Sequence, residues 1–347
     1  MGRGKRSGDV QVSAANVAGM RRAARWRWFL GVSAVGLLAG AGLLAQGARA
    51  SGLEGVPAFG HVFVIVGENQ GLNRLTPARS PYLTETIKPR SAFLTRYKGA
   101  TLGGSLANYL AIIAGRFTRC DLNDDLPSAR CSHAWDSLFG QLDRQGSSWR
   151  EWAESEDSAC DIFDHGSAWS SNVYTAHHQP AIYLTRIHGR GYDEAITPAA
   201  ECRRDVLAMG TTAPSDTGGF DAALASGAVG RFNLVVPNDC EDGHDPCAPV
   251  HDGVRQFDDF LRRELPKIEA SPAFGADGLI IITYDSGTSA KHPQVLFDVL
   301  GPQVRPGVYG GKAYNHISFL RTMEDGFGIA RHLAGAARAR PVTGIWR

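Results

Sequence analysis

The stretch His61-Val-Phe-Val-Ile-Val66, which ends at Gly67-Glu68-Asn69, decides the fold class of this 347-residue chain. Its apolar, β-branched residues leave no polar face, as in strands that are buried on both sides of a parallel sheet. Two similar runs follow at 232–236 and 278–284, and helical patterns lie between the runs. The sequence therefore predicts an α/β fold in which a mostly parallel central sheet is flanked by helices.

Helices are predicted at 106–114, 134–142 and 254–268, where apolar residues recur at helical spacing. The segment 120–210 is different, because it is rich in Cys, Trp, Ser and Asp and shows no clear strand. Open α/β sheets bind their ligands outside the carboxyl ends of the strands. We therefore expect 120–210 to be a loop-rich insertion that caps a pocket at those ends.

The first 50 residues differ in charge from the rest of the chain. They carry eight basic side chains and one acid, a net charge of +7, whereas residues 51–347 carry 28 basic and 34 acidic side chains, a net charge of −6. The basic residues precede an apolar stretch from Trp28 to Ala45 and then Ala48-Arg49-Ala50. This order is typical of a cleaved secretory signal. We expect 1–50 to be a signal peptide and 51–347 to be one secreted domain.

An uncleaved membrane anchor is the alternative for the leader, because its apolar stretch is close to the ~18 residues that a membrane span requires. The total charge of the chain is nearly balanced, at +1. Nucleic-acid-binding proteins usually carry a strong basic excess, so no nucleic acid partner is expected.

The six cysteines all lie beyond residue 50. An even number of cysteines in an exported chain predicts disulfide bonds. The spacings suggest three pairs, namely Cys120 with Cys131, Cys240 with Cys247, and Cys160 with Cys202. A zinc site is the alternative, but no two cysteines have the Cys-x-x-Cys spacing that structural zinc prefers.

The motif Gly103-Gly104-Ser105 opens an apolar helical run that closes at Gly115. Two glycines permit a sharp turn before the helix. Ser105 then has two interpretations. As an N-cap, its oxygen would accept a backbone N–H. As a nucleophile, it would attack a phosphate that binds to the free N–H groups of the helix start.

Polar side chains gather after the predicted strands and in the segment Tyr314-Asn315-His316. They are Glu68, Asn69, Asp242, His244, Asp285 and His316. Oxygen ligands with one or two imidazoles suit a divalent cation, which would activate a hydroxyl and neutralise phosphoryl charge. Each residue also has a structural alternative, such as a loop cap for Asp285 or a hydrogen-bonded buried ring for His316. Their joint appearance at successive strand ends favours the metal site.

Five motifs in order, from about residue 60 to 330, together resemble the bacterial phosphoesterase family. They are His61 through Asn69, Ser105-Leu-Ala-Asn108-Tyr, Pro237 through Asp245, Tyr284-Asp285, and Tyr314 through Asp325. That family includes acid phosphatases and phospholipases C within the alkaline-phosphatase-like superfamily. The resemblance implies an α/β sandwich, a metal ion and a covalent phosphoryl-enzyme intermediate.

The resemblance also implies roles for individual residues. The catalytic set is Ser105 as nucleophile, Asn108 facing the phosphoryl oxygens, and His178 contacting phosphate or protonating the leaving group. The metal set is Glu68, Asn69, Ser105, Asp242, His244, Asp285 and His316. Family members usually have an acid where this chain has Ser286 and a proline where it has Ala107. The first departure leaves open whether one or two ions bind.

We therefore expect a secreted, metal-dependent hydrolase of phosphoric esters, of the acid-phosphatase-like phosphomonoesterase type. Its cofactor would be a divalent metal ion and its partner a phosphate ester, with membrane lipid only as a substrate. A phospholipase C that acts on diesters is one alternative, which the lack of a long amphipathic helix disfavours. A catalytically inactive secreted binding protein on the same fold, suggested by Ser286, is another.

The leader generates the first testable prediction. If 1–50 is a signal peptide, N-terminal sequencing of protein recovered outside the cytoplasm should begin at or near Ser51. Recovery of the intact leader in the membrane fraction would show instead that it is an anchor.

Overall fold

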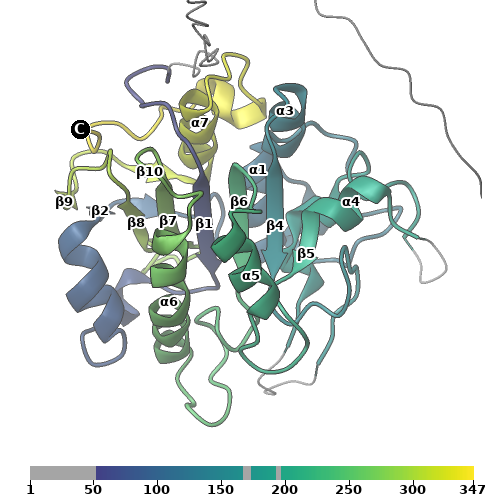
Figure 1. Ribbon diagram of the computed structural model, residues 1–347, viewed down its shortest axis with the longest axis horizontal. Helices are drawn as coiled ribbons and strands as arrows, with labels where there is room; N and C mark the ends of the chain where they lie inside the picture. Colours follow the sequence, from purple (N-terminus) through teal and green to yellow (C-terminus); the bar gives the residue numbers. More distant parts are fainter. Residues whose placement is uncertain (1–51, 167–172, 193–196) are drawn as a thin grey trace, which may run out of the picture. The chain divides into compact units, whose positions relative to one another are not determined.

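The centre of the fold is an eight-stranded sheet (Figure 1) in the order β5-β4-β6-β1-β7-β8-β2-β9. The computed structural model describes residues 52–166, 173–192 and 197–347, so the predicted signal peptide lies outside the described residues. Every neighbouring pair in the sheet is parallel except the two pairs of β8, which runs antiparallel to β7 and β2. The predicted α/β class with a mostly parallel sheet is confirmed.

The strands of the large sheet are β1 (Val62–Gly67), β2 (Ala92–Leu94), β4 (Trp149–Ala153), β5 (Val206–Ala208), β6 (Phe232–Val236), β7 (Leu279–Tyr284), β8 (Phe297–Leu300) and β9 (Gly307–Tyr309). A separate parallel pair consists of β3 (Tyr97–Lys98) and β10 (Tyr314–Asn315). The helices are α1 (Ser105–Ala114), α2 (Arg119–Leu122), α3 (Leu138–Arg144), α4 (Ala200–Asp205), α5 (Gly218–Ser226), α6 (Gly253–Ala270) and α7 (His316–Gly326).

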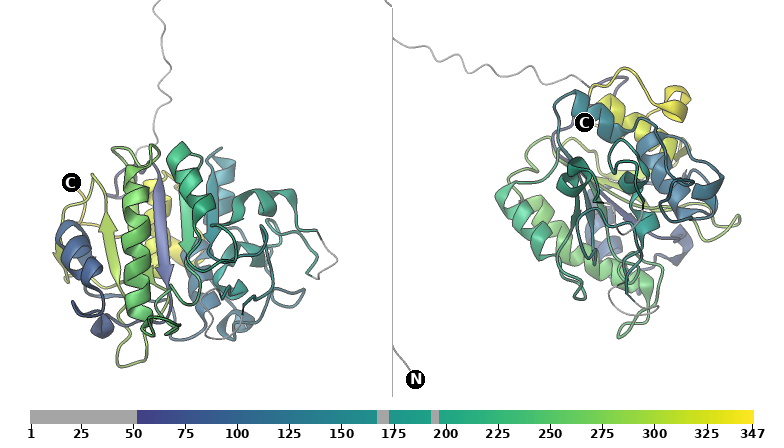
Figure 2. Two further views of the ribbon diagram at one scale, coloured as in Figure 1. Left: turned by 60° about the horizontal axis from the view of Figure 1, so that its bottom comes forward. Right: turned by 90° about the vertical axis from the view of Figure 1, so that its right-hand side faces the viewer.

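Helices cover both faces of the sheet. Helices α5 and α6 lie on one face, and α1, α3 and α7 lie on the other, as the views of Figure 2 show. Every residue of the central strands β1, β6 and β7 is buried. Because these three strands are parallel neighbours, their carboxyl ends lie side by side at one edge of the sheet.

The segment 120–210 is not strand-free, so that part of the prediction is wrong. It contributes β4 and β5, which extend the sheet beyond β6. The strand could not be recognised from an apolar pattern, because β4 has the sequence Trp-Arg-Glu-Trp-Ala, with two charged residues in a mostly buried strand. Arg150 forms an ion pair with Asp205, and buried Glu151 accepts a hydrogen bond from the Ala181 N–H. Partners distant in sequence therefore contact these polar groups, although Glu151 Oε1 has no hydrogen-bond partner among the described residues.

The helix expected at 134–142 begins only at Leu138. Ser137 is extended and its hydroxyl accepts a hydrogen bond from the Gly140 N–H at 3.3 Å, so this serine caps the helix. The helices expected at 106–114 and 254–268 are confirmed as α1 and α6. Within the described residues, no helix is long and apolar enough to cross a membrane.

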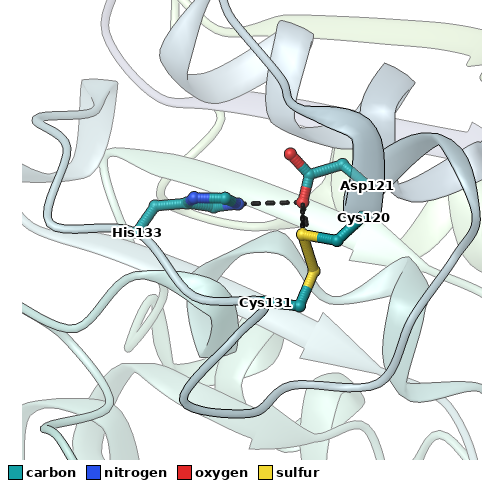
Figure 3. A group of neighbouring side chains, drawn as sticks. All are labelled: Cys120, Asp121, Cys131 and His133. Atoms are coloured by element: carbon teal, nitrogen blue, oxygen red, sulfur yellow. Dashed lines mark hydrogen bonds and ion pairs between the residues drawn. A yellow bond between two sulfur atoms is a disulfide. The ribbon is translucent and has the colours of Figure 1, made fainter.

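All three predicted disulfide pairs are present. Figure 3 shows Cys120 and Cys131 beside Asp121 and His133, a set of side chains whose types would suit zinc. The two sulfur atoms are bonded to each other, and Asp121 Oδ1 lies 2.8 Å from His133 Nε2. This group is therefore a disulfide with an adjacent hydrogen bond, and the zinc alternative is not supported.

The disulfides generate a prediction about stability. In the chain-entropy account, the Cys160–Cys202 bond, with a sequence separation of 42, should contribute about 4 kcal/mol, and the Cys240–Cys247 bond, with a separation of 7, about 2.5 kcal/mol. Replacing each pair by serines should lower the free energy of unfolding in that order, measured by denaturant titration. Equal losses, or a larger loss for the short loop, would show that loop closure does not set the ranking.

Candidate active site

Three carboxylates meet at the carboxyl edge of the sheet. Glu68 follows β1, Asp242 lies in the turn after β6, and Asp285 follows β7. Backbone hydrogen bonds join these segments, since the Glu68 N–H donates to the Asp242 carbonyl at 2.9 Å and the Asp285 N–H donates to the Gly67 carbonyl at 2.9 Å. The Asn69 N–H also donates to Asp285 Oδ1 at 2.8 Å. The prediction that residues after successive strands converge is confirmed for this group.

Ser105 is the first residue of α1 and points to this carboxylate group. Its hydroxyl donates to Glu68 Oε1 at 2.5 Å. The N-cap position belongs to Gly104, whose φ of 71° lies in the left-handed region that glycine adopts readily. The interpretation of Ser105 as an N-cap is therefore wrong. Its hydroxyl is available for chemistry because the glycine makes the turn.

The three carboxylates are buried, and no basic side chain is among the groups that shift their pKa values. Burial raises the pKa of Glu68 well above its usual range, and the negative charges of Asp285 and Asp242 raise it further. Burial likewise raises the pKa of Asp242, and it raises that of Asp285 to about 6. One oxygen of each carboxylate has no hydrogen-bond partner among the described residues. Such a group of buried acids is suited to binding a cation.

His178 completes the group from a different segment. It ends a short 3-10 helix, Ala176–His178, and its ring lies 5.4 Å from the Tyr109 ring, centroid to centroid. Its Nε2 is 3.4 Å from Glu68 Oε2, and its Nδ1 is 3.6 Å from Asp239 Oδ1 and 4.0 Å from Asp242 Oδ2. Burial lowers the pKa of His178 well below its usual range, so the ring is neutral and can bind a metal.

Asp239 is the residue that the sequence analysis missed. It lies in the same turn as Asp242, three residues earlier, and burial raises its pKa to about 7. Together with His178 and Asp242 it offers three ligand atoms within 4.8 Å of one another. The acidic cluster after Pro237 was the signal. Sequence alone could not show which of its acids points inward.

His316 supports the site from the N-terminus of α7. Its Nε2 lies 2.6 Å from the Asp285 carbonyl oxygen, which can only accept, so Nε2 carries the proton. The Tyr97 hydroxyl lies 2.8 Å from Nδ1 and therefore donates to it. Burial lowers the pKa of His316 to about 4, which keeps the ring neutral. Both ring nitrogens are occupied by these bonds, so the structure places His316 as a support for Asp285.

Two other predicted residues also point elsewhere. The His244 side chain is 51% exposed, with Nδ1 3.0 Å from Asp245 Oδ1. Asn108 is buried, and its Oδ1 accepts the N–H groups of Ala100 and Thr101 at 2.8 and 3.1 Å. The Asn108 amide thus holds the loop before Ser105, and its nitrogen also lies within hydrogen-bond distance of the Thr101 and Gly104 carbonyls.

Ser286 explains how Asn69 is oriented in this chain. The Ser286 hydroxyl donates to Asn69 Oδ1 at 2.5 Å, and the Asn69 amide nitrogen donates to Glu68 Oε1. Asn69 has a φ of 47°, a left-handed conformation that asparagine tolerates better than most residues. A serine here fixes the amide rather than adding a further negative charge.

The fold is a mostly parallel sheet with a serine at a helix start and buried carboxylates at its strand ends, and it is alkaline-phosphatase-like. Solved structures agree with the fold. A protein of the alkaline phosphatase superfamily from Vibrio parahaemolyticus matches with a TM-score of 0.54 and 14% identity over 83% of this chain and 71% of that one. Murine ectonucleotide pyrophosphatase/phosphodiesterase 5 matches with a TM-score of 0.52 and 10% identity over 83% of this chain and 100% of that one.

The chain belongs to the Phosphoesterase family, whose pattern it matches over residues 60–330. It is also 25% identical over 326 residues to a phosphatidylinositol-3-phosphatase of Mycobacterium tuberculosis (strain ATCC 25618 / H37Rv), covering 91% of this chain and 92% of the relative. The protein is therefore an enzyme that hydrolyses phosphoric esters.

The carboxylate group generates a prediction about the cation-free protein. Burial raises the pKa of Asp285 to about 6 in the folded protein. The free energy of unfolding therefore falls as the pH rises from the ordinary pKa of an aspartate to about 6, and the full loss remains at higher pH. Asp285→Asn keeps the acceptor for the Asn69 N–H and removes one negative charge. We expect it to raise the melting temperature in chelator at pH 8 by a few degrees.

The same substitution should reduce the stabilisation that added Mn²⁺ or Mg²⁺ gives, because a ligand has been weakened. Asp157→Asn removes an exposed carboxylate that does not act on the pKa values of this group, so it is the control and should change neither quantity. A lower melting temperature of Asp285→Asn in chelator would contradict the account in which burial of this charge destabilises the fold.

Proposed function

We propose that the protein is a secreted, metal-dependent phosphomonoesterase that forms a phosphoserine intermediate on Ser105. The observation that carries this proposal is the hydrogen bond from the Ser105 hydroxyl to Glu68 Oε1, inside a group of buried carboxylates. The hydroxyl of a serine in that position has an acceptor for its proton and does not cap the helix. The three disulfides support a location outside the cytoplasm, since such bonds persist in oxidising compartments.

The residues present fit a divalent cation, because unpaired buried oxygens of Glu68, Asp242 and Asp285 and an unpaired nitrogen of His178 converge. We assign two ligand sets. One set is Glu68, Ser105 and Asp285, beside Asn69, and the other is His178, Asp239 and Asp242. When bound, the cation lowers the pKa of a hydroxyl and neutralises phosphoryl charge.

Each side chain then has a defined task in the reaction. Ser105 Oγ attacks phosphorus and its proton passes to Glu68, while the bond from phosphorus to the alcohol oxygen breaks and that oxygen takes a proton from a water molecule, which leaves hydroxide. The hydroxide then attacks phosphorus, the bond to Ser105 Oγ breaks, and Glu68 returns its proton to the serine. His316 and Tyr97 hold the Asp285 segment in place throughout. His178 is neutral and buried, so we assign it to the ligand set instead of the role of general acid.

A phosphate monoester is the substrate class that this site supports best. A monoester presents three unsubstituted oxygens and up to two negative charges, which two neighbouring ligand sets can neutralise. The relative with 25% identity is named a phosphatidylinositol-3-phosphatase, and a phosphate on an inositol ring is also a monoester. We therefore propose that lipid headgroup phosphates lie within the substrate range of this chain.

Substitution of Ser105 tests the proposal directly. Ser105→Ala and Ser105→Gly should both stay folded, because the Ser105 hydroxyl does not cap the helix, and the rate should fall by several powers of ten. Rapid acid quench of the wild type should trap phosphate on the peptide that contains Ser105. Ser137→Ala, at the N-cap of α3, is the control, and it should lower stability by about 1 kcal/mol without affecting the rate.

The assays should use a phosphate monoester, a phosphate diester and phosphatidylinositol 3-phosphate vesicles, each with added Mn²⁺ or Mg²⁺ and with chelator. Near-normal turnover by a folded Ser105→Gly enzyme would refute the serine nucleophile. Faster hydrolysis of the diester would assign the chain to the phospholipase C type, and full rate in metal-free enzyme would refute the cation.

A further inference from the structure

Helix α1, which carries the nucleophile, begins without a capping side chain of its own. Its N-cap residue is Gly104, which has no side chain that could accept a backbone N–H. An uncapped helix start frays more easily, because its first N–H groups lack acceptors. The start of α1 is the place where Ser105 must be held within hydrogen-bond distance of Glu68. Another part of the chain must therefore stabilise this turn.

Asp124 supplies the missing acceptor from a segment 18 residues further on. Its Oδ1 accepts the Leu106 N–H at 2.9 Å. Leu106 is the second residue of α1, and the N–H of that position is one that an N-cap side chain normally satisfies. A carboxylate there also interacts favourably with the positive end of the helix. Asp124 thus acts as a cap that is not local in sequence.

The turn that carries Asp124 is fixed on several sides. Thr118 and Asp121 form a reciprocal capping box at the start of α2, and Asp121 also contacts His133. The Cys120–Cys131 disulfide closes the same turn, as Figure 3 shows. Two N–H groups, those of Asn123 and Asp125, donate to the Cys120 carbonyl at 3.2 Å. Asp124 is therefore presented by a rigid element.

The same turn packs directly against the residue before the nucleophile. A Cβ atom at Gly104 would lie 2.6 Å from Leu122 Cα, closer than atoms can approach. Gly104 therefore must be glycine both for its φ and for this contact. The backbone of the turn and the carboxylate of Asp124 hold the first turn of α1 from two directions.

We propose that Asp124 is a positioning residue for the nucleophile, and that the disulfide-closed turn 118–131 exists in part to present it. Asp124 does not touch the carboxylate group, so its effect passes through the geometry of Ser105. The catalytic half of this inference rests on the proposed function, because it requires Ser105 to be the attacking group. The capping half does not depend on any activity.

Asp124→Gly removes the carboxylate without strain, since Asp124 has a φ of 55° that glycine adopts freely. Asp124→Asn keeps the acceptor and removes the charge. Asp125→Gly, one residue along and exposed, is the matched control for added backbone freedom. Hydrogen–deuterium exchange of the peptide at the start of α1 should speed up in Asp124→Gly, stay near wild type in Asp125→Gly, and be restored in Asp124→Asn.

Steady-state kinetics on a soluble monoester give the second readout. We expect kcat of Asp124→Gly to fall by about 30- to 100-fold with little change in KM, because misplacing a reacting group by ~1 Å has effects of that size. Asp124→Asn should recover most of kcat. A structural role alone would lower the melting temperature of Asp124→Gly but leave kcat unchanged at a temperature where the protein is folded.

The outcomes separate the two claims. Unchanged exchange in Asp124→Gly would overturn the inference whether or not the enzyme is active. Faster exchange with normal kcat, or an equal loss of kcat in Asp125→Gly, would overturn the positioning role. An inactive wild type on every phosphate ester would refute the proposed function, and the exchange experiment would still decide the capping claim.

Discussion

The crowding of buried carboxylates at one edge of the sheet is the constraint on which the rest of the site depends. Glu68, Asp242 and Asp285 are each at most 4% exposed, and the charges that raise the pKa values of Glu68 and Asp242 are those of neighbouring acids. Burying like charges destabilises a fold unless something neutralises them. The parallel arrangement of β1, β6 and β7 makes this crowding unavoidable, since it brings the three strand ends together.

Ser105, the proposed nucleophile, is placed by groups that are not adjacent to it in sequence. Asn108 holds the loop before Ser105, Asp124 caps helix α1, and Glu68 accepts a hydrogen bond from the Ser105 hydroxyl. Their shared effect is to hold one hydroxyl against one carboxylate, while glycine makes the turn. An enzyme gains rate from such fixed geometry, because the reacting groups then lose little freedom in the transition state.

The sequence predicted the fold and the convergence of Glu68, Asp242 and Asp285 at the strand ends, and it failed where tertiary partners decide the outcome. Continuous apolar runs identified β1, β6 and β7, because burial on both faces leaves a clear pattern. Strand β4 was missed because the partners of its charged residues are far away in sequence. Asp239 was missed and His316 was assigned to the metal for the same reason. Residue type limits what a side chain can do, and only the fold shows which atom it faces.

Anomalous X-ray scattering from crystals soaked in Mn²⁺ is the most direct test of the central claim, that the carboxylate group is a cation site serving Ser105. The account predicts a peak within coordination distance of Glu68, Asp285 and Ser105 Oγ, about 2.1–2.3 Å from the nearest oxygens. Occupancy next to His178 and Asp239 would extend the site to two ions. A map with no peak at the carboxylates, in crystals that bind Mn²⁺ elsewhere, would contradict the account.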